Sequence, residues 1–127
     1  MRRIEPVGKV DAELAVPGSK SISQRALIAA ALADGAEGES LLRGALDSED
    51  TRHLRAALRA LGVEIDDSDA ACWRVRGCGG RPRAPEAPIF LGNNGTATRF
   101  LASWPPWPTA RFTSPATPAW PNAPSRR

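Results

Sequence analysis

The 127-residue sequence has no tyrosine, one histidine and two cysteines, and it contains no long run of apolar residues. A single histidine provides no histidine pair for a metal site, so we expect no metal ion. Two cysteines without a secretion signal are typical of a reducing compartment, which predicts a cytoplasmic protein. The lack of roughly 20 consecutive apolar residues argues against a membrane span.

Excess charge of either sign is also missing from most of the chain. The net charge of +3 comes from three arginines after residue 103, because the other 14 of the 17 basic residues match the 14 acidic ones. A nucleic-acid-binding protein is expected to carry a basic face with stacking aromatics. Only Trp73, Phe90 and Phe100 are aromatic in the balanced part. The composition therefore argues against nucleic acid as a partner.

What the sequence does contain is a turn that runs into a helix and carries cations and hydroxyls, at residues 17–25 (PGSKSISQR). Ser19 or Ser21 can cap the helix. The helix start offers unpaired N–H groups and a positive dipole end, to which Lys20 adds a point charge. Arg25 lies on the same helix face as Ser21. The segment predicts a carboxylate or phosphate site, with an ordinary capped helix as the alternative, and it lacks the glycine spacing of a nucleotide P-loop.

A second candidate anion site is the loop Gly92-Asn93-Asn94-Gly95-Thr96, which follows a short apolar strand. Glycine and asparagine tolerate positive φ, so successive N–H groups can converge there into an anion-binding nest. Thr96 or Thr98 can cap the helix that follows. An ordinary strand-to-helix turn is the alternative interpretation.

Between these two segments, residues 46–62 predict a structural helix. Asp47 or Ser48 caps it, and Gly62 ends it. His53 is expected to be a polar group on the helix surface. The apolar residues recur at helical spacing and predict a buried stripe of Leu54, Ala57, Leu58 and Leu61.

Together the three segments resemble the enolpyruvyl transferase family, in its 5-enolpyruvylshikimate-3-phosphate synthase (3-phosphoshikimate 1-carboxyvinyltransferase) branch. Residues 16–32 are similar to the family's first phosphate-binding segment, residues 46–63 to its Leu-Asp-Ser-x-Asp-Thr-Arg helix, and residues 91–101 to its Leu-Gly-Asn-x-Gly-Thr-x-x-Arg loop. The branch that acts on UDP-N-acetylglucosamine opens instead with a Gly-Ala-Lys-Asn type sequence. That branch remains the less favoured relative.

The resemblance implies a transferase of the shikimate pathway, which leads to chorismate and the aromatic amino acids. Such an enzyme moves the enolpyruvyl group of phosphoenolpyruvate to the 5-hydroxyl of shikimate 3-phosphate and releases phosphate. The resemblance implies no cofactor and a monomeric full-length protein, and it places the acid–base residues beyond this chain, so the catalytic residues are unknown. It implies that shikimate 3-phosphate contacts Lys20, Ser21 and Arg25, with Lys20 also reaching phosphoenolpyruvate, and that phosphoenolpyruvate faces Asn93, Gly95 and Thr96.

The expected fold class is α/β (α+β), a truncated part of the family's fold of repeated strand–helix units (an inside-out α/β barrel). Helices are predicted at 21–33, at 48–61 and from about residue 96. Strands are predicted at 9–16, 39–45, 63–65, 72–76 and 89–91. The first helix is expected to turn one face inward, formed by Ile22, Ala26, Ala29, Ala30 and Ala33.

The composition changes after Ser103. Residues 104–127 hold seven of the 12 prolines and three of the four tryptophans. We therefore predict two parts: residues 1–103 as the N-terminal portion of an enolpyruvyl transferase domain, and 104–127 as a disordered tail produced by a reading-frame error. A natural Pro/Trp-rich tail that binds a partner is one alternative, and a non-catalytic anion-binding module is another. Because the family is much longer, the chain alone is expected to be an inactive fragment.

Overall fold

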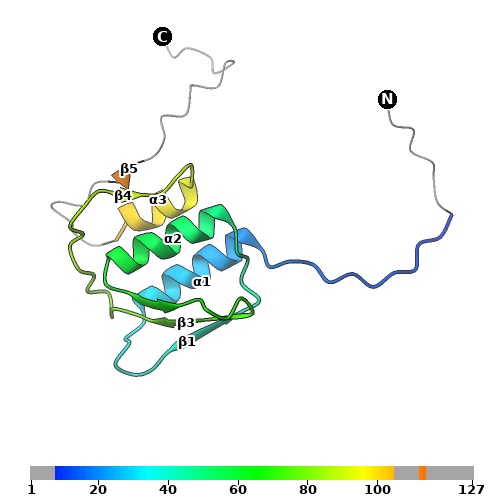
Figure 1. Ribbon diagram of the computed structural model, residues 1–127, viewed down its shortest axis with the longest axis horizontal. Coiled ribbons are helices and arrows are strands. Elements are labelled where there is room, and N and C mark those ends of the chain that lie inside the picture. Colours follow the sequence, from blue (N-terminus) through cyan, green and yellow to red (C-terminus); the bar gives the residue numbers. More distant parts are fainter. Residues whose placement is uncertain (1–7, 105–111, 114–127) are drawn as a thin grey trace, which may run out of the picture.

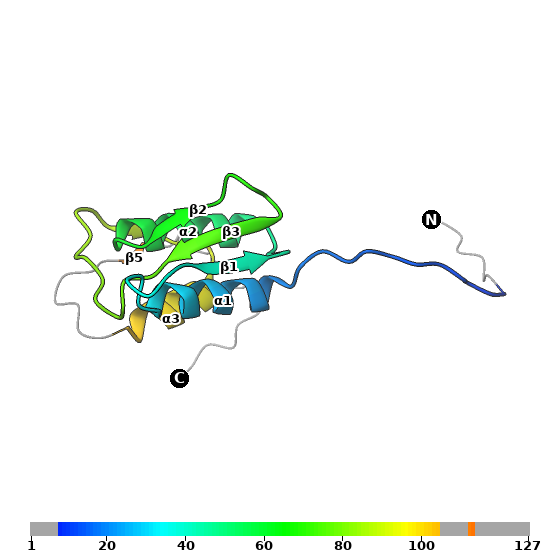
Figure 2. The same cartoon turned by 90° about the horizontal axis from the view of Figure 1, so that it is seen from below.

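A computed structural model describes residues 8–104 and 112–113 of the chain. Helices α1 and α2 cover one face of a three-stranded antiparallel sheet, α3 packs against α1, and a parallel pair of short strands lies beside the helices (Figures 1 and 2). The helices are α1 (Lys20–Leu32), α2 (Glu49–Ala60) and α3 (Gly95–Ala102). The sheet has the order β1-β3-β2, and the parallel pair is β4-β5. The strands are β1 (Ser40–Arg43), β2 (Glu64–Asp66), β3 (Cys72–Arg76), β4 (Ile89–Phe90) and β5 (Phe112–Thr113).

The central strand β3 shows why only one face of the sheet is covered. Trp73 and Val75 are buried, whereas their neighbours Arg74 and Arg76 are exposed. This alternation is the period of a strand with one buried face. The buried residues of β3 share one hydrophobic core with the apolar stripe of α2, in which the predicted Leu54, Ala57, Leu58 and Leu61 are all buried.

The inward face of α1 differs from the prediction. Ile22 is 69% exposed and Ala29 is also exposed. Polar side chains can take the inner face because some of them find partners there. The Ser23 hydroxyl, for example, accepts a hydrogen bond from the backbone N–H of Leu46 at 2.8 Å. The face that packs against α2, α3, β1 and β3 is formed by Ser23, Gln24, Leu27, Ile28, Ala30 and Ala31.

The strand predicted at residues 9–16 is absent from the described structure. These residues carry an alternating apolar pattern, yet Val10, Leu14 and Val16 are 73–84% exposed. The segment runs away from the helices and the sheet as an extended chain (Figures 1 and 2). A strand requires a hydrogen-bonded neighbour, and none of the described strands pairs with this segment.

The end of α1 is held by the chain that follows β3. The backbone N–H of Cys78 donates to the carbonyl of Ala31 at 2.9 Å, and that of Gly79 donates to the carbonyl of Ala33 at 2.9 Å. The last carbonyls of a helix have no partner within the helix. Here a distant backbone segment satisfies them and joins the sheet to the first helix.

Three residues of the predicted tail lie in the described structure. Trp104 is 6% exposed and belongs to the hydrophobic core, and Phe112–Thr113 forms β5, which pairs with β4. These three residues therefore belong to the described fold, while the boundary at residue 103 and the disordered tail stay predictions. The rest of the predicted tail, residues 105–111 and 114–127, lies outside the described residues.

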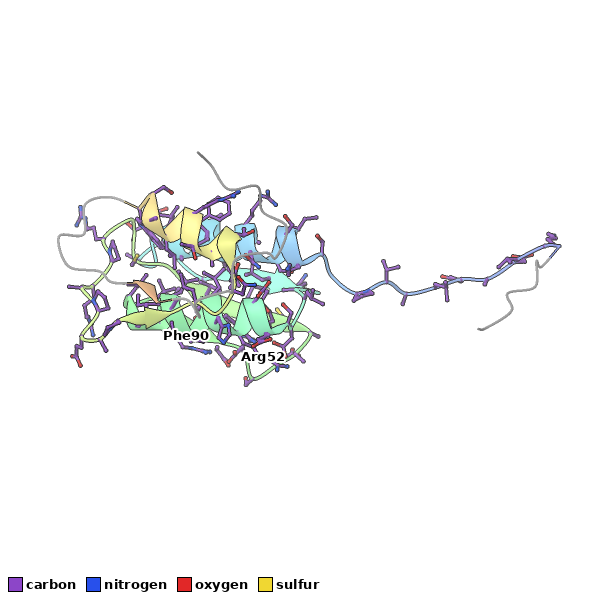
Figure 3. All side chains as sticks on the ribbon, turned by 90° about the horizontal axis from the view of Figure 1, so that it is seen from above. Arg52 and Phe90 are labelled. Carbon is purple, nitrogen blue, oxygen red and sulfur yellow. The ribbon has the colours of Figure 1, made fainter. Side chains whose placement is uncertain are left out.

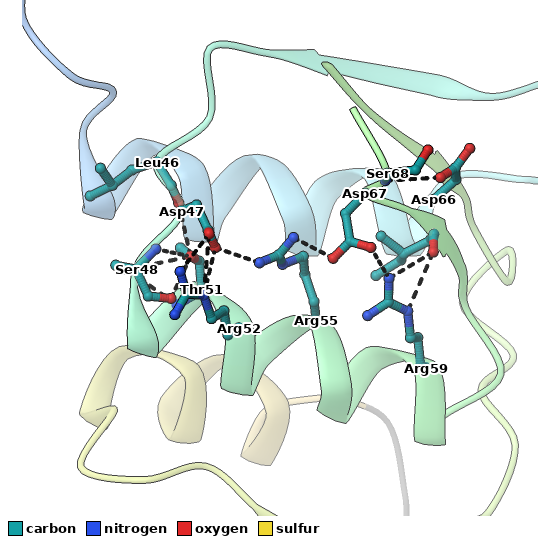
Figure 4. Close-up of polar contacts among 11 residues, drawn as sticks. Leu46, Asp47, Ser48, Thr51, Arg52, Arg55, Arg59, Asp66, Asp67 and Ser68 are labelled. Carbon is teal, nitrogen blue, oxygen red and sulfur yellow. Dashed lines mark hydrogen bonds and ion pairs between the residues drawn. The ribbon is translucent and has the colours of Figure 1, made fainter. Parts of the chain in front are cut away.

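An ionic chain fastens the turn after β2 to α2 (Figure 4). Arg55 is buried, lies 4.1 Å from the ring centre of Trp73, and pairs with both Asp47 and Asp67. Asp47 also pairs with Arg52 at 2.7 Å, and Asp67 with Arg59 at 2.6 Å. A buried arginine keeps its charge, so it needs such carboxylate partners.

The ionic chain predicts a loss of stability in acid. Hydrogen bonds from Arg52, together with the charges of Arg52 and Arg55, hold the pKa of Asp47 below its ordinary value of 3.8. Hydrogen bonds from Ser68 also lower the pKa of Asp66. The folded state therefore binds these protons less readily than the unfolded chain does. The resulting stability is fully present above the ordinary carboxyl range and is lost as pH falls through the folded pKa values.

Urea unfolding followed by circular dichroism between neutral pH and about pH 3 measures this loss. The midpoint is expected to fall most steeply below about pH 4. Asp47→Asn cannot titrate at this position, so its urea midpoint should fall less steeply as the pH is lowered. An equal pH dependence of the urea midpoint in both proteins would contradict the contribution of Asp47 to stability.

Candidate functional site

The first predicted anion segment forms the start of α1. The Ser19 hydroxyl caps the helix by accepting from the N–H of Ile22 at 3.5 Å. Arg25 donates to the Ser21 side chain and to the Ser21 carbonyl, so the two residues share a face as predicted. Lys20, Ser21 and Arg25 are all exposed. The positive end of α1 and two cations thus face solvent together.

The second helix contributes an acidic start. Ser48 caps α2 in a capping box with Thr51, and the first turn carries Glu49 and Asp50. The Thr51 hydroxyl also donates to the carbonyl of Leu46 at 2.8 Å. Acidic residues are favoured in the first turn of a helix, and these bonds fix the position from which Asp50 extends.

The second predicted anion segment forms the start of α3, but its cap is Asn94 rather than Thr96 or Thr98. The Asn94 side-chain oxygen accepts from the N–H of Ala97 at 3.0 Å. The Thr98 hydroxyl instead donates to the Asn94 carbonyl at 3.0 Å. An asparagine two residues before Thr96 is closer to the helix start and is itself a strong cap, which the sequence analysis overlooked.

The loop reaches this position because Gly92 passes close to α2. Gly92 has φ +58°, and a Cβ there would lie 2.5 Å from Nδ1 of His53. All described residues with positive φ are glycines, so Asn93 and Asn94 do not adopt the left-handed conformation that asparagine tolerates. His53 is half-buried between this loop and Phe90, whose ring lies 5.1 Å away edge-on and beside α2 (Figure 3). It is therefore less of a surface group than predicted.

The starts of all three helices meet at Asp50. Its carboxylate accepts from Nζ of Lys20 at 2.8 Å, and its backbone carbonyl accepts from Nδ2 of Asn94 at 3.0 Å. The three helices run side by side in the same direction, so their N-terminal ends lie at one end of the bundle (Figure 1). The structure thus brings the two predicted anion segments together through Asp50, a residue of the helix predicted to be structural.

The remaining predicted residues lie around this end. Asn93 and Gly95 are exposed and Thr96 is half-buried. Arg25 also lines an apolar groove of about 460 Å³ between α1 and α3, whose other walls include Phe100 and Trp104. Unpaired N–H groups at helix starts and nearby cations attract carboxylates and phosphates. The arrangement can therefore stabilise negatively charged oxygens.

Two other features are absent from the described residues. No group of three or more His, Cys, Asp or Glu side chains among residues 8–104 and 112–113 is arranged to hold a metal ion. None of the helices in this same part of the chain is long and apolar enough to cross a bilayer.

Comparison with known proteins shows which family the chain belongs to. A family model described as EPSP synthase (3-phosphoshikimate 1-carboxyvinyltransferase) matches residues 4–105. A curated protein of that name from Rhizobium leguminosarum bv. trifolii is 56% identical over 87 residues, which cover 68% of this chain and 20% of the relative. Another from Pseudoalteromonas translucida is 42% identical over 102 residues, which cover 80% of this chain and 23% of the relative.

A solved EPSP synthase structure from Acinetobacter baumannii is also similar. It superposes with a TM-score of 0.69 and 29% sequence identity, over 81% of this chain and 23% of that one. The chain thus spans about a fifth of the length of the curated relatives it matches. Because a family model covers most of its residues, this chain belongs to the EPSP synthase family, the 3-phosphoshikimate 1-carboxyvinyltransferases.

Proposed function

We propose that the chain forms part of the substrate site of a 3-phosphoshikimate 1-carboxyvinyltransferase. This enzyme transfers the enolpyruvyl group of phosphoenolpyruvate to the 5-hydroxyl of shikimate 3-phosphate and releases phosphate. The observation that carries the proposal is the meeting of three helix N-termini beside Lys20, at the two segments that resemble the family's anion-binding motifs. Both substrates are polyanions, and helix N-termini with a nearby cation bind such anions.

The proposed roles follow the two segments. At the start of α1, Lys20, Ser21 and Arg25 bind shikimate 3-phosphate, and Lys20 also reaches phosphoenolpyruvate. At the start of α3, Asn93, Gly95 and Thr96 face phosphoenolpyruvate. Fixed cations and N–H dipoles stabilise the charge that moves between carboxylate and phosphate oxygens without having to reorganise. We further propose a cytoplasmic, monomeric enzyme that requires no cofactor.

The 127-residue chain is proposed to bind these anions without turning them over. It spans about a fifth of the length of its relatives. Catalysis requires all the groups that act together across a closing cleft, so some of those groups alone do not suffice. A phosphate-release assay with both substrates should give only background. Release at ordinary enzyme rates would show instead that residues 1–127 hold a full catalytic set.

The chain offers a matched pair of lysines for testing the binding role. Lys9 and Lys20 are its only lysines. Lys20→Met should weaken the binding of shikimate 3-phosphate about tenfold, because it removes one charge-assisted hydrogen bond worth roughly 1.5 kcal/mol at an exposed position. Isothermal titration measures this affinity. Lys9→Met, which removes the same charge from the extended segment, should leave it unchanged.

If both lysine variants bind shikimate 3-phosphate with the affinity of the original chain, the start of α1 is not the binding site. The proposed role of Lys20 is then wrong. Equal losses in the two variants would indicate general charge attraction rather than a built site. The same titration with inorganic sulfate tests the alternative of a non-catalytic anion-binding module. That alternative predicts comparable affinities for sulfate and for shikimate 3-phosphate.

A further inference from the structure

Asp50 is the residue through which the starts of the three helices touch. Its side chain accepts from Nζ of Lys20, and its main chain accepts from the side chain of Asn94, the cap of α3. Asp50 is itself fixed, because it stands in the first turn of α2 behind the Ser48 cap. One residue therefore makes a side-chain contact to α1 and a backbone contact to the loop before α3.

The side-chain contact matters because Lys20 is an exposed, long side chain with many rotamers. Its side chain is 58% exposed, and a lysine ammonium on four methylene groups samples many rotamers. The carboxylate of Asp50 is only 25% exposed and moves with the helix. Holding the ammonium at 2.8 Å selects the rotamers that point it toward the shared helix end.

We propose that Asp50 is a positioning residue for Lys20: it holds the ammonium where a phosphate or carboxylate of the substrate can bind. The inference rests on the proposed function. An ammonium has three N–H donors, so one can remain with Asp50 while the others reach the anion. A side chain that is already ordered loses less entropy when the anion arrives, and binding is correspondingly tighter.

The negative charge of Asp50 acts in the opposite direction, since it repels an incoming anion. The two effects are separable by substitution. Asp50→Ala removes both the bond and the charge. Asp50→Asn removes the charge but keeps an oxygen that can accept from the ammonium. Neither change touches the backbone bond from Asn94, so the loop before α3 keeps its anchor.

Amine acylation followed by mass spectrometry of the 127-residue chain tests the proposal. With only two lysines, Lys9 serves as an internal reference, since its side chain is 87% exposed and lies 3.9 Å from an equally exposed Asp11. The ratio of Lys20 to Lys9 labelling is measured without ligand and then against increasing phosphoenolpyruvate or inorganic phosphate. Circular dichroism checks that each variant is folded.

Without ligand, Asp50→Ala should raise the Lys20 to Lys9 labelling ratio roughly 2- to 10-fold, because the ammonium is no longer held. The phosphoenolpyruvate concentration that protects Lys20 should rise by a similar factor. Asp50→Asn should restore that protection. Should Asp50→Ala not fold, Asp50→Ser removes the carboxylate with a residue better suited to a helix start.

Three other results would overturn the inference in different ways. Unchanged protection in Asp50→Ala shows that Asp50 does not position Lys20 for the ligand. Tighter protection in both Asp50→Ala and Asp50→Asn shows that repulsion dominates and that Asp50 opposes binding. If phosphoenolpyruvate and phosphate fail to protect Lys20 even in the unsubstituted chain, the proposed function fails and the positioning role fails with it.

Discussion

Replacing Gly77 with alanine is expected to lower the free energy of unfolding by about 3 kcal/mol or more, the upper range for overpacking a close contact. A Cβ at Gly77 would lie 2.2 Å from the carbonyl oxygen of Ala33 and 2.5 Å from that of Ala30. Both oxygens belong to the backbone at the end of α1, so no side chain can rotate to relieve the clash. The next two residues donate hydrogen bonds to this same helix end, and these bonds would have to lengthen.

Urea denaturation followed by circular dichroism measures the effect. Gly95→Ala is the matched control, because no atom lies within 4 Å of the position its Cβ would take and its φ is not positive. The control should stay within roughly 1 kcal/mol of the original chain. Equal midpoints for Gly77→Ala and the original chain would show that the junction between the sheet and α1 is looser than the structure has it.

Replacing Gly18 with alanine is expected to abolish measurable anion binding, with a loss on the order of 100-fold. A Cβ at Gly18 would lie 2.2 Å from the carbonyl oxygen of Gly44 and 2.9 Å from the backbone nitrogen of Leu46. The start of α1 must then move away from the loop before α2. A displacement of about 1 Å in positioned groups can cost roughly 100-fold in a reaction that depends on geometry, and we expect a comparable loss in binding because Lys20 lies two residues further on.

Titration of shikimate 3-phosphate into Gly18→Ala measures this loss, and Gly8→Ala serves as the control because its Cβ would have no atom within 4 Å. The helical signal in circular dichroism should largely persist in Gly18→Ala, because the clash lies at one end of α1. Retained affinity would mean that residues 44–46 shift without moving α1. The close contact between Gly18 and these residues would then not be what positions the site.

The regular elements could largely be predicted from local patterns. The strand predicted at 72–76 matches β3 residue for residue, and the helix predicted at 48–61 encloses α2. Both carry strong signals: alternation around Trp73 and Val75 in the strand, and a serine cap followed by an apolar stripe in the helix. The failed strand at 9–16 has the same alternation, but the described structure gives it no neighbour, which a local pattern cannot reveal.

The site was harder to predict, because its assembly depends on contacts between distant residues. Hydroxyls and cations at residues 19–25 marked the start of α1, yet nothing local links Lys20 to Asp50, 30 residues later. The Asn94 cap is a local feature that the sequence analysis overlooked in favour of the threonines. Its second bond, to the carbonyl of Asp50, is visible only once α2 and α3 are packed.

The common direction of α1, α2 and α3 has a consequence for how quickly ligands arrive. The aligned dipoles of the three helices give this helical bundle a positive end and a negative end, although residues 1–103 carry balanced formal charge. A diffusing phosphate ester feels this polarity before contact and is guided to one side. The association rate should therefore decline as ionic strength rises, whereas close contacts, once made, are shielded less.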